Sequence, residues 1–475
     1  MALSLLIVFL ALGAAAQING PAAQIDELMR YCQSHEMFNG VILVKQAGET
    51  IYEKAWGLAD LRDGRKLTTD TAFYLASVSK QFTAMGVMLL VERGQLSFDS
   101  KLSEFFPEFP AYADDVTVQD LMTHTSGIPD HFRLLDGGAD RLTNRQVLEA
   151  LTAVPELDFE PGTRFSYSNG GYVLLAMIIA KAADQPFPEF MKENIFEPLD
   201  MDRTLVYDES RPEIVNRAVG FDPYGGLDEY TILTTGAGGI YSTVGDLSKW
   251  DDALYGDKLI SPATLERAFS PTRLNDGEVS DYGFGWGIRT IDGHKIVGHS
   301  GGLNGFRTLI MRNLERRNAV IMLTNFGDTM DFGELSRQIA AILNGKRATM
   351  PKAPVGLYLA RVIEEDGLAA ALVAYDEIRS HSEDSAYDLV ESQLNNLGYH
   401  YLERGQTDTA IVFFKMNVEA YPDSFNAYDS LGEGYMAKGL SRLAIASYAR
   451  SLVLNPDNQN ALTMLMRLQE LPKGE

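Results

Sequence analysis

The chain contains very little cysteine and comparatively little positive charge. Its single cysteine, Cys32, excludes an intramolecular disulfide. Cys32 follows Ile25 and Leu28 at helical spacing, so we predict a buried helix residue rather than a reactive thiol. Lysine and arginine number 41 against 65 aspartates and glutamates, which gives a formal net charge of −24. This balance argues against a nucleic-acid partner and against electrostatic attachment to an anionic membrane, because both need a basic surface.

Metal-ligand patterns and long apolar runs are lacking too. The seven histidines show no H-E-x-x-H or similar paired spacing, so we predict neither a metal nor another cofactor.

The apolar run at residues 3–12 is too short to span a membrane comfortably, and small residues (Ala14, Ala15 and Ala16) follow it. This pattern predicts a signal peptide at residues 1–16 and an exported, periplasmic or extracellular protein. A buried first strand and a membrane anchor are the alternatives, because the segment carries no lysine or arginine.

Residues 17–344 have the composition and patterning of one large α/β domain. Apolar residues make up 45% of the chain, enough for a sizeable core. Strand patterns occur at both ends of the domain, and a mostly helical stretch at about 96–265 separates them. We therefore predict an antiparallel sheet flanked by helices, with a helical insertion. The expected strands are 40–45, 50–56, 285–290, 295–297, 306–311 and 319–323, and the expected end helices are 24–33 and 332–343.

The C-terminal part changes to a purely helical pattern with an internal repeat. Glycines and prolines mark a linker at residues 345–356, before the domain at 357–475. Six positions recur 34 residues later: Gly398, Tyr401, Gly405, Ala410, Ile411 and Pro422 return as Gly432, Tyr435, Gly439, Ala444, Ile445 and Pro456. The period and the Leu-Gly-x-x-Tyr spacing resemble the tetratricopeptide repeat, which predicts an all-α solenoid. Such a tail binds a protein partner or packs against its own catalytic domain, and both alternatives stay open.

The pair Ser77 and Lys80 carries the strongest chemical signal. A spacing of three places hydroxyl and amine on one face of a helical turn. Burial and the positive end of the helix dipole both favour a neutral amine, which could then act as a base. These are the groups needed for nucleophilic acyl transfer without a catalytic histidine. Taken alone, the pair also fits a helix-capping serine and a solvated lysine.

Two further motifs follow in order along the chain. Tyr167 and Asn169 form a Tyr-Ser-Asn run before an apolar helix, and His299-Ser300-Gly301-Gly302 follows an expected strand. Together with Ser77-x-x-Lys80, this order resembles the signature of serine β-lactamases and penicillin-binding proteins. The residues at these motif positions are most similar to those of one branch of the family, which contains class C β-lactamases, D-Ala-D-Ala carboxypeptidases and β-lactamase-like esterases. The runs 120–127, 236–242 and 282–286 also resemble that branch.

This resemblance implies a β-lactamase/transpeptidase-like fold and a role for each motif residue. Ser77 would be acylated, with Lys80 and Tyr167 sharing the base and proton-relay work in a proportion that the sequence leaves open. Asn169 would orient the substrate or Lys80. The segment His299, Ser300, Gly301 and Gly302 would bind substrate, and the N–H groups of Ser77 and Gly302 would form an oxyanion hole.

A competing motif lies inside the third segment. Residues 298–302 also match G-x-S-x-G, the nucleophile elbow of α/β-hydrolases. That elbow needs a helix directly after the serine and an acid and a histidine downstream. A strand is expected from Phe306, and the only later histidines, His381 and His400, lie in the repeat tail. We therefore reject Ser300 as the nucleophile.

The position of His299 concerns the substrate, because classical β-lactamases carry lysine there. A histidine with an ordinary pKa near 6.5 is mostly neutral at pH 7. We expect weak or pH-dependent recognition of carboxylates between pH 5 and 8, and tolerance of neutral esters. The expected activity is that of an esterase or D-amino-acid peptidase acting on a small-molecule or peptide acyl substrate, rather than an efficient β-lactamase. The alternative is a penicillin-recognising or protein-interaction protein whose repeat tail carries the main role.

Overall fold

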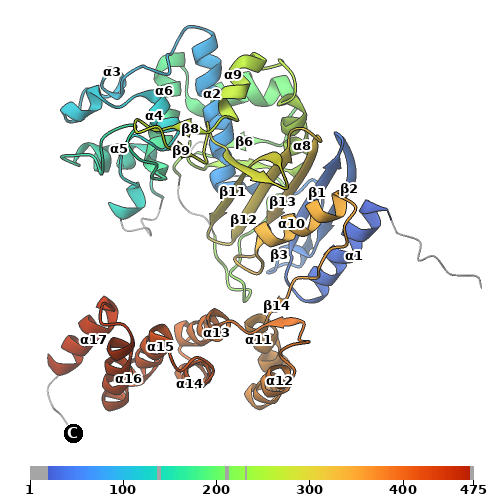
Figure 1. Cartoon of the computed structure of the whole chain (residues 1–475), viewed down its shortest axis with the longest axis vertical. Coiled ribbons are helices and arrows are strands. Elements are labelled where there is room, and N and C mark those ends of the chain that lie inside the picture. The colour runs from blue at the N-terminus through green and yellow to red at the C-terminus, as the bar shows by residue number, and fades with distance from the viewer. Residues whose placement is uncertain (1–19, 136–140, 209–212, 230–232, 471–475) are drawn as a thin grey trace, which may run out of the picture.

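The computed structural model describes residues 20–135, 141–208, 213–229 and 233–470 (Figure 1). The expected signal segment at residues 1–16 lies outside them. The chain forms an α/β unit that ends with α10 (Phe332–Leu343), followed by a row of helices from α11 (Val355–Asp366) to α17 (Gln459–Glu470). None of the described helices is long and apolar enough to cross a membrane.

A six-stranded antiparallel sheet in the order β10-β11-β12-β13-β1-β2 forms the centre of the α/β unit. Its strands are β1 (Gly40–Gln46), β2 (Glu49–Trp56), β10 (Gly287–Ile291), β11 (His294–Leu303), β12 (Phe306–Asn313) and β13 (Asn318–Thr324). Strand β1 pairs with β13, with Gly40 opposite Thr324, so segments from both ends of the domain close one sheet as predicted. The strand expected at 295–297 is longer than predicted, because β11 pairs with β12 as far as Leu303.

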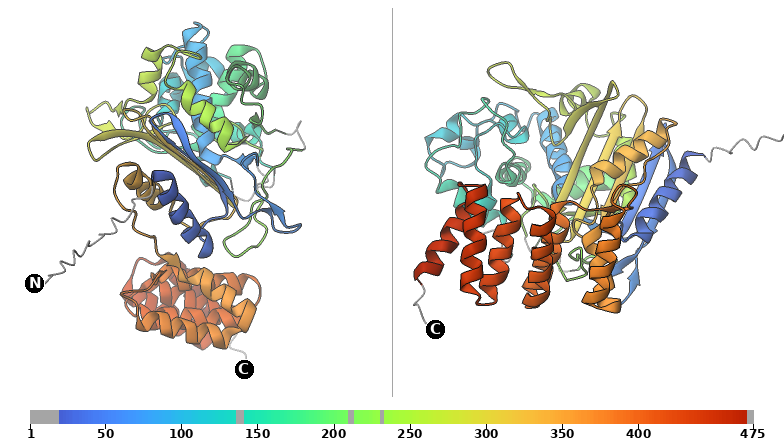
Figure 2. Two further views of the ribbon diagram at one scale, coloured as in Figure 1. Left: turned by 90° about the vertical axis from the view of Figure 1, so that its right-hand side faces the viewer. Right: turned by 60° about the horizontal axis from the view of Figure 1, so that its bottom comes forward.

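Both faces of the sheet are buried at its central strands β1 and β13, which explains why these two strands are apolar. On β1, Val41 and Leu43 enter the core beneath α2 (Lys80–Glu92), whereas Ile42 and Val44 pack under α1 (Pro21–Ser34) and α10. Successive side chains of a strand point to opposite faces, so a strand covered on both sides is apolar throughout. Figure 2 (left) shows α1 and α10 together on one side of the sheet and the remaining helices of the domain on the other.

The stretch 96–265 is less helical than predicted. It consists of short helices separated by loops, and several of them start at a capping hydroxyl: Thr117, Thr143 and Ser168 each accept a hydrogen bond from a backbone N–H of the first turn. Between α2 and α10 the α-helices are α3 (Leu102–Phe105), α4 (Val118–Met122), α5 (Asn144–Thr152), α6 (Asn169–Ala183), α7 (Phe187–Met191), α8 (Val244–Ala253) and α9 (Pro262–Ala268). The single helical turns of the domain are η1 (Ala76–Ser79), η2 (Ala111–Asp114), η3 (His131–Arg133), η4 (Lys192–Phe196) and η5 (Glu197–Leu199). Short strands pair between them: β3 (Leu58–Asp60), β4 (Arg65–Lys66), β5 (Phe73–Tyr74), β6 (Leu205–Val206), β7 (Ile240–Ser242), β8 (Thr272–Arg273) and β9 (Val279–Ser280).

The C-terminal region is all-helical apart from one short strand pair. Its helices are α11, α12 (Leu368–Ser380), α13 (Glu391–Glu403), α14 (Thr407–Ala420), α15 (Phe425–Ala437), α16 (Ser441–Leu454) and α17, and successive helices pack side by side (Figure 2). A Cβ on Gly398 would lie 2.4 Å from the ring of Phe414, and one on Gly432 would lie 2.8 Å from the ring of Tyr448. The glycines that recur in the sequence therefore allow the same close helix contact in two successive helix pairs. β14 (Ala353–Pro354) pairs with β15 (Tyr387–Asp388) where the helical row begins.

Candidate active site

Ser77 lies on η1, which is one turn of 3-10 helix, and Lys80 is the first residue of α2, which follows η1 directly in the chain. The sequence predicts one helical turn carrying both residues, and the structure divides that turn between two helix types. Ala76 enters the turn with φ of 48°, a left-handed conformation that is uncommon for alanine. The turn brings Lys80 Nζ to 3.1 Å from Ser77 Oγ.

The Lys80 ammonium is fully buried. Burial lowers its pKa to about 7, and the Asp130 carboxylate opposes this shift. A large fraction of Lys80 is therefore neutral at neutral pH. This agrees with the expectation of a neutral amine, and burial is its main cause.

The hydrogen-bond partners of Lys80 determine where its lone pair points. Nζ donates to Asn169 Oδ1 at 2.8 Å and to the carbonyl oxygen of Ala237 at 3.0 Å. The orientation of the Asn169 amide is fixed, because its Nδ2 donates to the Asp130 carboxylate at 2.8 Å. Both partners of Nζ can only accept, so they occupy the two hydrogens of the neutral amine. The lone pair is left to accept a hydrogen bond from the Ser77 hydroxyl.

Tyr167 is the third member of the group. Its ring lies 4.8 Å from Lys80 Nζ, and its hydroxyl is hydrogen-bonded to Ser77. Burial raises its pKa well above the usual value, so the phenol is neutral near pH 7. His124 packs against its ring at 4.2 Å between centroids and accepts a hydrogen bond from the Ser168 N–H through Nδ1.

The structure brings in three residues to which the sequence assigned no role: His124, Asp130 and Tyr282. His124 and Tyr282 lie in the runs 120–127 and 282–286 that carry the family resemblance, so those runs were the available signal. Asp130 follows the first run by only three residues. Each of them contacts a predicted site residue rather than standing in a motif of its own.

His299 is half-buried and held by two hydrogen bonds. Its Nδ1 donates to the carbonyl oxygen of Ser300 at 2.6 Å, so Nε2 is the acceptor of the Tyr282 hydroxyl at 2.9 Å. Burial, helped by the positive charge of Lys80, lowers the pKa of His299 to about 4. The imidazole is therefore mostly neutral between pH 5 and 8, which favours weak over pH-dependent recognition of carboxylates by His299.

Strand β11 packs directly against η1. A Cβ on Gly301 would lie 3.0 Å from the Ser77 backbone nitrogen and 2.4 Å from the Leu75 carbonyl oxygen, so only glycine allows this approach. Ser300 and Gly302 are exposed on the same strand. Ser300 lies within a ten-residue strand and not at a turn between a strand and a helix. The structure therefore does not support Ser300 as the serine of a nucleophile elbow.

A groove of about 760 Å³ begins beside Tyr167, His299 and Ser300 and runs over β10 to β12. Its walls are partly apolar, and two of its arginines, Arg307 and Arg337, are paired with carboxylates. The third arginine, Arg289, is exposed and has no ion-pair partner among the described residues. In the described part of the chain, no cluster of three or more His, Cys, Asp or Glu could hold a metal ion.

Comparison with known proteins agrees with this geometry. The family described as Beta-lactamase matches residues 22–344. The chain belongs to the β-lactamase family. A penicillin-binding protein of Bacillus subtilis (strain 168) is 34% identical over 374 residues, which cover 72% of this chain and 82% of that protein. A D-aminopeptidase of Brucella anthropi is 28% identical over 354 residues, covering 72% of this chain and 66% of that protein.

Solved structures show the same relationship. The octameric penicillin-binding protein homologue from Pyrococcus abyssi superimposes with a TM-score of 0.62 at 27% identity, over 72% of this chain and 81% of that chain. A D-amino acid amidase from Ochrobactrum anthropi SV3 gives a TM-score of 0.59 at 25% identity, over 68% of this chain and 99% of that chain. This β-lactamase-family protein is a serine hydrolase with the predicted fold.

Proposed function

We propose that this chain is an exported serine hydrolase that forms an acyl-enzyme on Ser77 and acts as an esterase or D-amino-acid peptidase. The observation that carries the proposal is the buried Lys80, whose lone pair faces Ser77 Oγ. The N-terminal signal pattern places no constraint on this chemistry. Export rests on the sequence pattern at residues 1–16 alone.

In the acylation step, the neutral amine of Lys80 takes the proton of Ser77 while Oγ forms a bond to the substrate carbonyl carbon. The carbonyl oxygen becomes negative and is stabilised by the N–H groups of Ser77 and Gly302. The bond to the leaving alcohol or amine then breaks. Tyr167, a neutral phenol, passes the proton from Lys80 to that leaving group, and the same residues activate water for deacylation. In this scheme Lys80 is the base and Tyr167 the relay.

The substrate proposal rests on the state of His299. A neutral imidazole whose two nitrogens are already hydrogen-bonded offers no cation to a substrate carboxylate. The D-aminopeptidase and amidase relatives support a substrate with a D-amino-acid acyl group.

Labelling with a fluorescent penicillin tests the nucleophile. We expect Ser77→Ala to abolish labelling and turnover, and Ser300→Ala to retain both. Loss of labelling with Ser300→Ala but not with Ser77→Ala would contradict the proposal.

The substrate class is tested with a neutral ester, a D-amino-acid amide and a penicillin at equal concentrations. We expect turnover of the first two and slow release of the third. Penicillin hydrolysis faster than turnover of either other substrate would refute the substrate assignment.

A further inference from the structure

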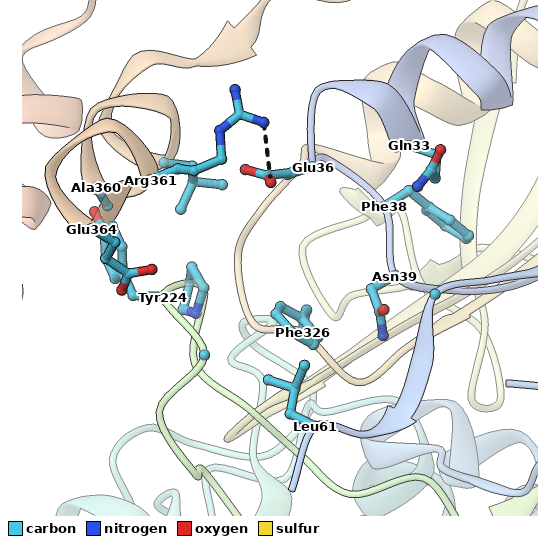
Figure 3. A pocket seen from close by; sticks show the side chains of 14 residues that line it. Gln33, Glu36, Phe38, Asn39, Leu61, Tyr224, Phe326, Ala360, Arg361 and Glu364 are labelled. Carbon is cyan, nitrogen blue, oxygen red and sulfur yellow. Dashed lines mark hydrogen bonds and ion pairs between the residues drawn. The ribbon is translucent and has the colours of Figure 1, made fainter. Parts of the chain in front are cut away.

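The row of helices docks on the hydrolase domain beside a cavity of about 380 Å³ that both parts line. Figure 3 shows Arg361 of α11 reaching across to Glu36, with an Arg361 NH1 to Glu36 Oε1 distance of 3.4 Å. On the hydrolase side the cavity is bounded by Phe326 and Tyr224, which stand near each other in the same view. The helical region is therefore in direct contact with the domain that carries Ser77.

The contact centres on one loop of the hydrolase domain, residues 221–228. Tyr224 stacks on His400 of α13, with ring centroids 4.1 Å apart. Asp222 lies 3.6 Å from the guanidinium of Arg404, one turn further along α13. Arg404 also donates to His400 Nδ1 at 2.6 Å, which keeps that imidazole neutral and correctly turned toward Tyr224. The loop is held by an aromatic and a charged contact from the same helix.

Loop 221–228 is internally rigid. The carboxylate of Asp222 accepts hydrogen bonds from the N–H groups of Tyr224 at 2.7 Å and Gly226 at 2.9 Å. The Asp222 N–H donates to the Gly226 carbonyl oxygen at 2.7 Å. A displacement of Tyr224 would therefore move the loop as one body.

The other end of the loop holds the turn between β11 and β12. Asp228 accepts hydrogen bonds from the Asn304 side chain at 2.7 Å and from the Gly305 N–H at 3.0 Å. A Cβ on Gly305 would lie 2.3 Å from the Phe221 nitrogen, so the turn and the loop are in backbone contact. The same turn ends the segment Gly301–Gly302 that packs against Ser77. A continuous set of contacts thus joins α13 to the strand beside the nucleophile.

We propose that the helical tail is a positioning element of the hydrolase, which holds the oxyanion segment of β11 against Ser77 through loop 221–228 and the Asn304–Gly305 turn. The inference rests on the proposed acyl-enzyme function. Oxyanion donors act only if they are preorganised, and supporting contacts are what keep them so. Tyr224, Asp222 and Arg404 are positioning residues, since none of them touches the reacting atoms. A partner that competes for Arg404 would lower the rate of acylation.

Two variants from opposite sides of the contact test the proposal in the full-length protein. Tyr224→Ala and Arg404→Met each remove one part of the docking contact. Tyr224→Phe keeps the ring that stacks on His400, and Arg467→Met removes an exposed arginine of α17. Turnover of a neutral ester is measured together with the affinity for a boronic acid, whose adduct with Ser77 mimics the tetrahedral intermediate.

We expect Tyr224→Ala and Arg404→Met to lower kcat and boronate affinity in parallel by about tenfold, with KM within about twofold of wild type. Tyr224→Phe and Arg467→Met should match the wild type in all three measurements. Unchanged kcat and boronate affinity in both docking variants would overturn the positioning role while Ser77-dependent turnover of the wild type stands. Absence of that turnover in the wild type would instead overturn the proposed function. A parallel loss of thermal stability and activity in all four variants would also count against positioning.

Discussion

Replacing Asp130 by asparagine should make the enzyme more active in acid, although it removes a negative charge from the site. Asp130 is linked to Lys80 through the Asn169 amide by two hydrogen bonds of 2.8 Å each. The carboxylate stabilises the ammonium form of Lys80 and so keeps its pKa higher than burial alone would. Asparagine retains the shape and its oxygen can still accept from Asn169, but the variant loses the charge and the hydrogen bond that the other oxygen accepts from the Phe132 N–H. The pKa of Lys80 should therefore fall in Asp130→Asn.

The size of the shift follows from the geometry. Two hydrogen bonds in series with an amide separate the two charges by roughly 7 Å. With an effective dielectric constant of about 20, Coulomb's law then gives about 2 kcal/mol, or about 1.5 pKa units. Because the neutral amine is the base, kcat/KM of the wild type should rise with pH to a plateau, with a midpoint near the Lys80 pKa of about 7. In Asp130→Asn the midpoint should move down by about 1.5 units, which raises the neutral fraction of Lys80 at pH 6 about eightfold.

The assay is the pH profile of kcat/KM for a neutral ester between pH 5 and 9, so that no substrate group titrates in the range. Asp99→Asn is the matched control, because Asp99 is exposed and far from Lys80 in the fold. A midpoint that stays in place or moves upward in Asp130→Asn would refute the assignment of Lys80 as the base. A shift of equal size in the control would refute the local electrostatic cause.

Three further predictions concern packing. Gly301→Ala should lower kcat by at least about tenfold in steady-state kinetics on the ester. The added Cβ would lie 2.4 Å from the Leu75 carbonyl oxygen and would push β11 away from the nucleophile. Gly398→Ala should destabilise the helical tail by about 1–3 kcal/mol through overpacking, seen as a lower melting temperature of the tail with unchanged melting of the hydrolase domain. Asp251→Ala should destabilise the hydrolase domain by about 3–5 kcal/mol, because it leaves two buried cations, Lys45 and Arg312, without their shared carboxylate. Lys45→Met should destabilise the domain less. Equal losses of unfolding free energy in urea for the two variants would contradict this reasoning.

The regular part of the fold could be predicted because its signals are local. The strand patterns at 40–45 and 50–56 predict β1 and β2 at nearly their observed bounds, and α10 occupies the residues expected for the closing helix. The 34-residue repeat predicts paired helices, because a glycine is required wherever two helices touch as closely as at Gly398. Where the signal was weak, in the stretch 96–265, helix length was overestimated because hydroxyl caps restart short helices.

The candidate site was only partly predictable. Four site residues could be predicted because each of them stands in a recognisable sequence motif: Ser77, Lys80, Tyr167 and Asn169. His124, Asp130 and Tyr282 could not be assigned roles, because they act on those residues through contacts between segments far apart in the chain. A mostly neutral His299 at pH 7 was expected from an ordinary pKa, but the further lowering of that pKa could not be predicted, because it comes from burial and the charge of Lys80 in the folded protein.

The sequence by itself determined the kind of chemistry, because a serine, a lysine and a tyrosine in ordered motifs are enough to identify serine acyl transfer. Only the tertiary structure decided how those groups are set for the reaction. Burial sets the pKa of Lys80, and the Asn169 amide and the Ala237 carbonyl direct its lone pair toward Ser77. Desolvation and hydrogen-bond direction arise from packing between distant segments, so they have no counterpart in local sequence.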